Sequence, residues 1–430
     1  MNPRLGFVGL THLGVVSAAA ASAKGFATLA YDADAALADA VGEGRLPVAE
    51  PGLDALLAAH PIRTTADPRD LQGCDLVYFA TDVPTDEAGS SNLAGIEASI
   101  AAILPHLAPH APLVVLCQVP PGFTRRIALP PPRLIYQVET LVFGRAVERA
   151  LEPERFILGL ADPAQPPPEA LATFLAAFGC PVLPMRYESA ELCKIAINCC
   201  LAASVGVANT LAELSEGLGA DWAEIVPALK LDRRIGSHAY LAPGLGLAGG
   251  NIERDLATVR GLAAAAGSDA GVIAALVENS RHRRDWALRV LHERVLNHRS
   301  DPLIGILGLA YKEDTASTRN SQALALIAAL RPFRLRLHDP VVPAEAAGHP
   351  RATPCATPIE AARGADALVL MTPWPHFRGL DPAALRQVMA GRVLIDPHRL
   401  LDGAAAAAAG FHYHALGQRP LCPGEAAAHA

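Results

Sequence analysis

The chain has 430 residues, of which 51% are hydrophobic and 18% charged, a composition typical of a globular protein with two or three domains. Its net charge of −7 argues against a nucleic-acid partner, and no apolar run reaches the roughly 18–20 residues of a membrane span. The eight cysteines show no paired CxxC spacing, which favours reduced thiols over a zinc site, and we expect no metal.

The first stretch of the chain predicts a strand, a turn and a helix. Residues 4–9 are apolar enough for a buried strand, and an alanine-rich helix follows to about Lys24. The next apolar segment ends on an acid about 20 residues after the turn, as in the dinucleotide fingerprint G-x-G-x-x-G. This spacing favours an acid that binds ribose hydroxyls, and so NAD over NADP. The predicted cofactor-binding residues here are Gly9, Thr11, His12, Leu13, Gly14 and Asp32.

Two features of this stretch allow other interpretations. Thr11 takes the place of the middle glycine, where the backbone normally approaches the pyrophosphate, so its side chain is expected to weaken cofactor binding. Arg4, followed by apolar and then small residues, also imitates a signal peptide. The second strand, ending on Asp32, favours the nucleotide fold and therefore a cytoplasmic protein.

Strands and helices continue to alternate over about 185 residues, which predicts a doubly wound parallel sheet with ligands at the carboxyl ends of its strands. We assign residues 1–186 to this Rossmann-type NAD-binding domain. Proline and polar residues follow three of its later strands, at Pro84, Thr85, Gln118 and Glu139.

Residues 187–298 predict a central domain of long helices. Glu191, Lys194 and Asn198 are spaced i, i+3 and i+7 and therefore share one helix face. From spacing alone, a lysine in such an apolar helix is most often a surface group whose stem covers apolar neighbours. Arg234, close to Asp232, is on the same grounds a member of a solvated charge pair.

A glycine-rich stretch lies inside this central domain, at Pro243–Leu256. Four glycines in eight residues let the backbone approach a bound group, and Arg254 and Asp255 follow at once. Such a loop is by itself weak evidence, because many glycine clusters are only turns. After the polar stretch 297–301, a new strand at 303–307 opens a third, Rossmann-like α/β domain, residues 299–430.

Over roughly residues 4–420 the chain resembles the UDP-glucose/GDP-mannose dehydrogenase family. Gly308–Ser321 resembles the family motif G-L-A-F-K-x-D-T-D-D-T-R-x-S, and Gly244–Leu256 aligns without a gap to G-F-G-F-G-G-S-C-F-P-K-D-L. Several positions depart from the family, among them Asn209–Thr210 in place of the family's N-E. Asn251 replaces the catalytic cysteine, Gln118 replaces a threonine that helps to hold a catalytic water, and the substrate-side arginine of D-x-R-N has become His398 or moved to Arg399.

The resemblance assigns roles residue by residue. It implies six catalytic positions: Lys194, Asn198, Asp255, Asn251, Gln118 and Glu139. It implies that the substrate is bound by Glu139, Lys194, Asn198, Arg234, Tyr240, Gly244, Gly246, Gly250 and Lys312. It adds Pro84, Thr85, Gln118 and Arg319 to the cofactor site. It also implies a homodimer formed by the central helices and a UDP-, GDP- or dTDP-linked sugar as substrate.

In this family C6 of a nucleotide sugar is oxidised twice, and the second oxidation needs a thiolate to trap the aldehyde. Without that thiol, we expect an NAD-dependent oxidoreductase that stops at the aldehyde. Two alternatives stay open: a redox-neutral epimerase or isomerase with retained NAD, and a catalytically inactive nucleotide-sugar-binding homologue. Retention of Lys194, Asp255 and Lys312 favours an enzyme, and Cys117 is a possible substitute nucleophile.

Overall fold

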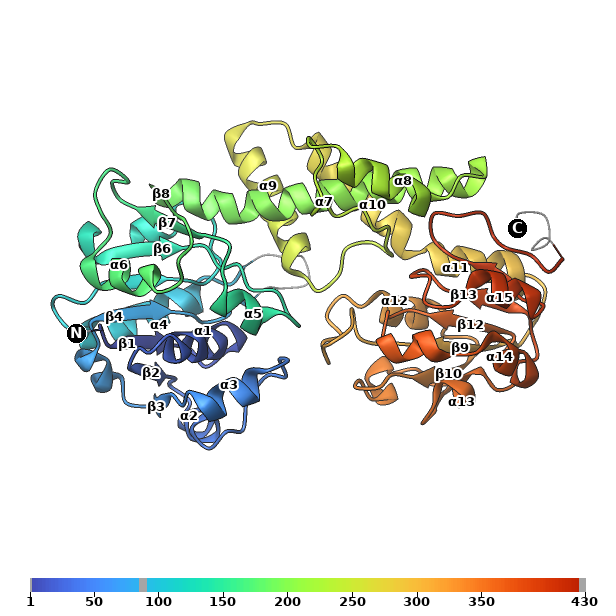
Figure 1. The fold of residues 1–430 in the computed structure, drawn as a ribbon, viewed down its shortest axis with the longest axis horizontal. Helices are drawn as coiled ribbons and strands as arrows, with labels where there is room; N and C mark the ends of the chain where they lie inside the picture. Colours follow the sequence, from blue (N-terminus) through green and yellow to red (C-terminus); the bar gives the residue numbers. More distant parts are fainter. Residues whose placement is uncertain (1, 85–90, 425–430) are drawn as a thin grey trace. The chain divides into compact units, whose positions relative to one another are not determined.

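The computed structural model describes residues 2–84 and 91–424, so the predicted cofactor residue Thr85 lies outside the described residues. The chain divides into two compact units, Met1–Ile197 and Asn198–Ala430. Each unit contains one β-sheet with helices packed against it (Figure 1).

The first sheet has eight strands in the order β3-β2-β1-β4-β5-β6-β7-β8. Its first six strands are parallel and follow the Rossmann order, which confirms the predicted doubly wound sheet. One departure is that β7 runs antiparallel to β6, and β8 then follows β7 in parallel. The strands are β1 (Leu5–Val8), β2 (Thr28–Tyr31), β3 (Arg63–Thr65), β4 (Leu76–Phe79), β5 (Leu113–Val115), β6 (Leu134–Gln137), β7 (Phe156–Leu160) and β8 (Val182–Arg186).

Both faces of this sheet are buried, as alternate side chains of β4 show. Tyr78 packs in a core with residues of α1 and α6, whereas Val77 and Phe79 pack in a second core with residues of α4. A sheet covered on both faces explains why its strands are apolar at nearly every position. The helices of this unit are α1 (His12–Ala23), α2 (Ala35–Gly42), α3 (Leu53–Ala59), α4 (Ala94–Ile103), α5 (Ala146–Leu151) and α6 (Glu169–Ala176).

A single long helix, α7 (Tyr187–Leu218), starts directly after β8. Among the described residues it is the one helix long and apolar enough to cross a membrane. It nevertheless buries Glu191, Asn198 and Asn209, each of which is hydrogen-bonded to another protein group. Buried polar groups with protein partners are expected in the core of a globular protein. The buried polar side chains of α7 are therefore consistent with a helix that packs against other parts of the protein.

The second unit has a helical part followed by a second sheet. Its six strands are all parallel, in the order β11-β10-β9-β12-β13-β14, which confirms the predicted C-terminal α/β domain. The helices are α8 (Trp222–Leu231), α9 (Asn251–Ala266), α10 (Gly271–Arg284), α11 (Trp286–Leu291), α12 (Gln322–Ala329), α13 (Pro358–Ala362), α14 (Pro382–Val388) and α15 (Gly403–Ala408). The strands are β9 (Leu303–Leu307), β10 (Arg334–His338), β11 (Ala352–Pro354), β12 (Ala367–Leu370), β13 (Val393–Ile395) and β14 (His412–His414).

Candidate active site

The turn between β1 and α1 can be built only with glycine at two positions. Gly9 has φ of +100°, and a Cβ there would lie 2.6 Å from Thr81 Cγ2. A Cβ on Gly14 would lie 1.8 Å from the carbonyl oxygen of Gly9. The turn therefore brings the start of α1 close to the end of β1, and the backbone N–H groups at the start of that helix suit the pyrophosphate of a dinucleotide.

Gly14→Ala is expected to weaken NAD binding at least about a hundredfold, because the added methyl group must displace the turn. Titration of protein fluorescence with NAD measures this effect. Gly95→Ala, in the open second position of α4, is the matched control, since a Cβ there meets no atom within 4 Å. An unchanged NAD affinity in Gly14→Ala would show that the turn does not carry the cofactor.

The side chain of Thr11 is used by the protein itself. Its hydroxyl donates to the carbonyl oxygen of Ala80 at 2.9 Å and accepts the N–H of Gly14 at 3.5 Å, which makes Thr11 the N-cap of α1. The threonine thus ties the turn to the end of β4. Its predicted weakening of cofactor affinity stays a prediction.

Asp32 follows β2 and retains room for a ligand. Its Oδ2 accepts the N–H of Leu10 at 2.8 Å, its Oδ1 accepts the N–H of Asp34 at 3.0 Å, and the residue is half-exposed. A carboxylate can accept about four hydrogen bonds, so Asp32 can still accept bonds from ribose hydroxyls. The residues of this turn therefore fit NAD.

A second turn of the same kind begins the C-terminal sheet, with an acid that is already satisfied. Gly308 donates to the carbonyl of His338 at 2.8 Å, as Gly9 does to Tyr31. Asp339 accepts four backbone N–H groups and, at 3.1 Å, the indole N–H of Trp374. Burial acts to raise the pKa of Asp339, but the backbone donors outweigh burial and lower it. Of the two turns, the N-terminal one keeps the acceptor capacity that a ribose needs.

In the first unit, Glu139 and Lys194 form a mostly buried ion pair. Lys194 Nζ lies 3.2 Å from Glu139 Oε2, and the side chains are 12% and 18% exposed. Glu139 also accepts the N–H of Leu141 and so fixes its own loop after β6. The pattern-based interpretation of Lys194 as a surface group is wrong, because its ammonium group is buried and paired.

Glu191 shares this helix face and organises the loop after β5. It is fully buried and accepts the N–H groups of Gly122 and Thr124 at 2.5 and 2.8 Å, and burial raises its pKa. Gln118 lies in the same loop and is half-buried. Burial raises the pKa of the neighbouring Cys117 thiol to about 12, which argues against a thiolate nucleophile there.

In the second unit, Asn198 and Asp255 are joined. Asn198 lies one helical turn beyond Lys194 in α7, and its Nδ2 donates to Asp255 Oδ2 at 2.5 Å. Both residues are buried, and Arg254 Nε lies 3.5 Å from the other carboxylate oxygen. The family resemblance predicted both Asn198 and Asp255 as site residues, although 57 residues separate them in the chain.

The glycine-rich stretch is a packed loop that leads into α9. A Cβ on Gly246 would lie 2.4 Å from Ser280 O, and one on Gly250 would lie 2.7 Å from Arg319 Nε. The loop is further held by the amide of Asn209, which accepts the N–H of Gly244 at 2.8 Å. Sequence reasoning noted Asn209–Thr210 only as a departure from the family and missed this role.

Asn251 is the first residue of α9 and is exposed. Its side chain therefore stands at the positive end of a 16-residue helix, directly before the buried Arg254 and Asp255. A thiol at this position would be activated as a thiolate, whereas an amide cannot add to an aldehyde.

The remaining predicted residues lie in three settings. Lys312 Nζ is 5.8 Å from the ring centroid of Tyr311, and Arg319 packs against the glycine-rich loop. Arg234 pairs with Asp232 and its side chain is 88% exposed, while Tyr240 is 54% exposed. Within residues 2–84 and 91–424, no hydrogen bond or ion pair joins Arg234 or Tyr240 to another predicted site residue.

His398 and Arg399, the two residues that the family motif relates to its arginine, have different surroundings after β13. Arg399 pairs with Asp221 through contacts of 2.7 and 3.0 Å and donates to the carbonyl of Leu416. His398 lies 3.3 Å from the carbonyl oxygen of Met371, and burial lowers its pKa, so its imidazole is neutral at pH 7. Whether His398 or Arg399 takes the role of the family's arginine stays a prediction.

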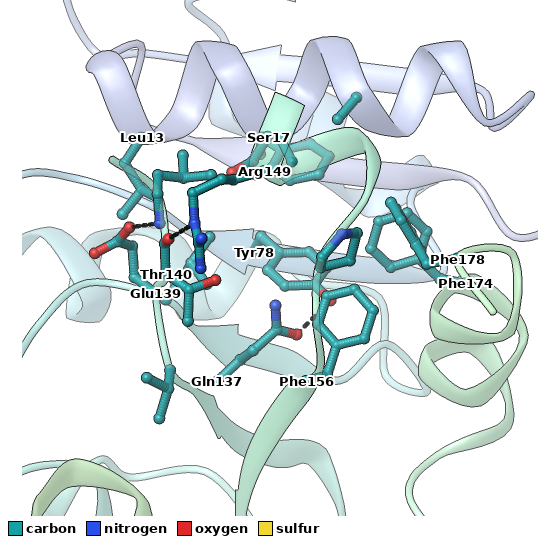
Figure 2. Close-up of a pocket in the computed structure, with 17 residues that line it drawn as sticks. Leu13, Ser17, Tyr78, Gln137, Glu139, Thr140, Arg149, Phe156, Phe174 and Phe178 are labelled. Carbon is teal, nitrogen blue, oxygen red and sulfur yellow. Dashed lines mark hydrogen bonds between the residues drawn. The ribbon is translucent and has the colours of Figure 1, made fainter. Parts of the chain in front are cut away.

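A cavity of about 60 Å³ lies in the first unit beside Glu139 and Thr140 (Figure 2), far smaller than the roughly 300 Å³ or more of ordinary ligand pockets. It cannot hold a dinucleotide or a nucleotide sugar. Among the described residues, no group of three His, Cys, Asp or Glu side chains could hold a metal ion.

Comparison with known proteins gives three family matches along the chain. They are the NAD binding domain of the UDP-glucose/GDP-mannose dehydrogenase family at residues 3–174, its central domain at 188–281 and its UDP binding domain at 305–403. UDP-glucose 6-dehydrogenase of Pseudomonas aeruginosa is 29% identical, with 96% of this chain and 97% of that protein covered. The Rhizobium meliloti enzyme of the same name is 28% identical, with 96% and 99% covered.

Solved structures agree with these matches. A UDP-glucose dehydrogenase from Pyrobaculum islandicum superimposes with a TM-score of 0.81 at 26% identity, covering 94% of this chain and 98% of that one. UDP-D-ManNAc dehydrogenase from Pyrococcus horikoshii gives a TM-score of 0.82 at 22% identity, covering 96% and 99%, and supports the fold.

Proposed function

Because the chain belongs to the UDP-glucose/GDP-mannose dehydrogenase family, with NAD as cofactor, we propose that it oxidises an alcohol carbon of a nucleotide-linked sugar, C6, and stops at the aldehyde. One observation carries the proposal. The mostly buried pairs Glu139–Lys194 and Asn198–Asp255 are present, and the resemblance in sequence aligns an amide, Asn251, with the family's nucleophile.

The first oxidation needs no covalent bond to the protein. When bound, NAD would supply the acceptor for the hydride of the alcohol carbon, while the hydroxyl gives its proton to a base and a C=O bond forms. Lys194 supplies a positive charge to the oxygen as it loses its proton, and Glu139 holds the ammonium group in place. In the second unit, Asn198 and Asp255 offer an amide and a carboxylate that can hydrogen-bond to a substrate or to a water.

The second oxidation would require a tetrahedral carbon that can lose a further hydride. The family forms it by adding a thiolate, and Asn251 has no thiol. The raised pKa of Cys117 leaves that residue a neutral thiol at pH 7. The aldehyde is therefore the expected product.

Incubation with NAD and a panel of UDP-, GDP- and dTDP-sugars tests the proposal, with NADH followed by absorbance and products by mass spectrometry. One NADH and a loss of two hydrogens per sugar are expected. Two NADH with a carboxylate product would contradict the missing second step. An isomerised sugar without net NADH would identify a redox-neutral enzyme, and tight binding without any product would identify a binding protein.

The same proposal assigns the substrate's nucleotide and sugar to Lys312, Arg234, Tyr240 and the glycine-rich loop, and places the protein in the cytoplasm. It also includes a homodimer. Exposed apolar side chains support the dimer, because Val207, Leu211, Leu214 and Leu218 form a stripe on one face of α7 and are 57%, 41%, 53% and 80% exposed.

Leu211→Glu combined with Leu214→Glu is expected to convert the dimer to a monomer. Burial of a leucine contributes about 1.5–3 kcal/mol, so losing two should raise the dissociation constant by roughly 10²-fold or more. Sedimentation velocity over a concentration series measures the change. Val341→Glu, in the loop after β10 and 51% exposed, is the control. A dimer of unchanged strength in the double variant would exclude this face of α7.

A further inference from the structure

Two buried side chains, His12 and Glu50, join the dinucleotide turn to another part of the first unit. His12 is the first residue of α1. Its Nε2 lies 2.9 Å from Glu50 Oε2, and the two side chains are 8% and 1% exposed. The His12 ring also stacks on Phe143 with a centroid distance of 4.1 Å. Burying such a polar pair is costly unless its other atoms have partners too.

Glu50 has those partners in the loop that follows β6. Its Oε2 accepts the N–H of Gly144 at 3.1 Å, and its Oε1 accepts the N–H of Ala146 at 2.8 Å. The donors are 94 and 96 residues further along the chain, at the start of α5. Hydrogen bonds to a carboxylate are among the stronger ones in proteins, so Glu50 holds the far end of this loop against α1 through His12.

The near end of the same loop carries the ion pair of the candidate active site. Glu139 lies between β6 and Gly144, and its carboxylate holds both the N–H of Leu141 and the ammonium group of Lys194. Polar contacts therefore hold the loop at both ends, through Glu139 at one and Glu50 at the other.

A small cavity borders the loop between these ends. Figure 2 shows Glu139 and Thr140 on one side of the cavity of about 60 Å³ and Leu13 and Ser17 of α1 on another. Side chains that line a void lack contacts on that side, so packing alone does not fix the position of Glu139. The hydrogen bonds at the ends must do so.

We propose that His12 and Glu50 are positioning residues, which link occupation of the dinucleotide turn to the placement of the Glu139 loop and thereby of Lys194. A ligand bound at the N-terminus of α1 restrains His12, which is hydrogen-bonded to Glu50. Glu50 in turn restrains the backbone of Gly144 and Ala146. The use of Lys194 in catalysis rests on the proposed function, whereas the link between turn and loop does not.

Hydrogen exchange followed by mass spectrometry on the full chain tests the link without turnover. In the wild-type protein, saturating NAD should slow exchange about fivefold or more both in the turn, residues 9–16, and in the loop, residues 138–147. His12→Phe keeps an aromatic ring beside Phe143 but removes the bond to Glu50, and Glu50→Gln removes the charge at constant shape. In both variants NAD should still slow the turn but no longer slow the loop.

Glu148→Gln is the matched control, because Glu148 lies in α5, is exposed and pairs only with Arg145 among the described residues. It should keep the wild-type pattern. A loop that NAD protects equally in His12→Phe and wild type overturns the inference, as does wild-type protection confined to the turn. If Glu50→Gln does not fold, the comparison of His12→Phe with wild type still decides.

A kinetic measurement separates positioning from a merely structural role. In His12→Phe, kcat should fall about tenfold or more while KM for NAD changes less than about threefold. A variant that was only partly folded would also lose kcat, but its melting temperature would be lower, whereas a positioning role leaves the melting temperature unchanged. The full exchange pattern in a protein that oxidises no nucleotide sugar would support the link and overturn the proposed function instead. Normal turnover without the exchange pattern would support the proposed function and overturn the link between turn and loop.

Discussion

Lys194→Met is expected to lower kcat by about three orders of magnitude, which corresponds to about 4 kcal/mol of transition-state stabilisation. The substitution keeps most of the length of the side chain and removes the positive charge that lies 3.2 Å from Glu139 Oε2. Without it, the alcohol oxygen has no cation to stabilise the negative charge that develops as its proton leaves. Initial rates of NADH formation with the nucleotide sugar found active in the panel measure the loss.

Protein stability must be separated from this effect, because Lys194→Met leaves the carboxylate of Glu139 mostly buried and unpaired. Breaking a buried pair in this way costs of the order of 3 kcal/mol. Lys194→Met combined with Glu139→Gln removes both charges and should recover much of the stability but none of the activity. Lys230→Met, an exposed lysine of α8, is the control for loss of a lysine. Wild-type turnover in Lys194→Met would remove this residue from the mechanism.

Asn251→Cys is expected to change the product from aldehyde to acid and the yield from one NADH per sugar to two. The position begins α9, where the helix dipole favours a thiolate, and the side chain is exposed. The introduced sulfur adds to the aldehyde carbon, the resulting thiohemiacetal loses a hydride, and water cleaves the thioester to release the acid. Mass spectrometry of the product together with NADH stoichiometry measures the change.

Asn251→Ser controls for size and polarity, since an unactivated hydroxyl is a poor nucleophile at neutral pH. It should still yield the aldehyde. Acid production by both variants would mean that water, and not the introduced sulfur, is the nucleophile. An aldehyde product from Asn251→Cys would show that this side chain does not reach the oxidised carbon.

Much of the fold could be predicted because strand and helix patterns alternate so regularly before residue 186 and again after residue 303. The reversal at β7 could not. The segment between β6 and β7 contains only the six-residue α5, and neither its length nor its composition states the direction in which the next strand runs. Pairing with neighbouring strands decides that, and it is a property of the folded sheet.

The candidate site also has a part that sequence patterns could predict and a part that they could not. Helical spacing placed Lys194 and Asn198 on one face of a helix, but their partners Glu139 and Asp255 lie 55 and 57 residues away, and no local pattern pairs them. Sequence patterns assigned no role to Glu50, although this residue holds the start of α1 and the loop before α5. Thr11 looked like a defect in the fingerprint because its side chain was judged without its acceptor, the carbonyl of Ala80.

Asp32 and Asp339, the acids that follow β2 and β10, differ in how many hydrogen-bond acceptor positions they leave unfilled. This difference should affect how NAD changes the thermal stability of the two sheets. The oxygens of Asp339 accept four backbone N–H groups and the indole N–H of Trp374, whereas Asp32 has acceptor positions that a bound ligand can fill. A ligand bound only by the native state adds RT ln(1 + [L]/Kd), about 2.7 kcal/mol at a hundredfold excess over Kd. NAD should therefore raise the melting temperature of the N-terminal sheet selectively, and a preparation stripped of NAD should lose that sheet first.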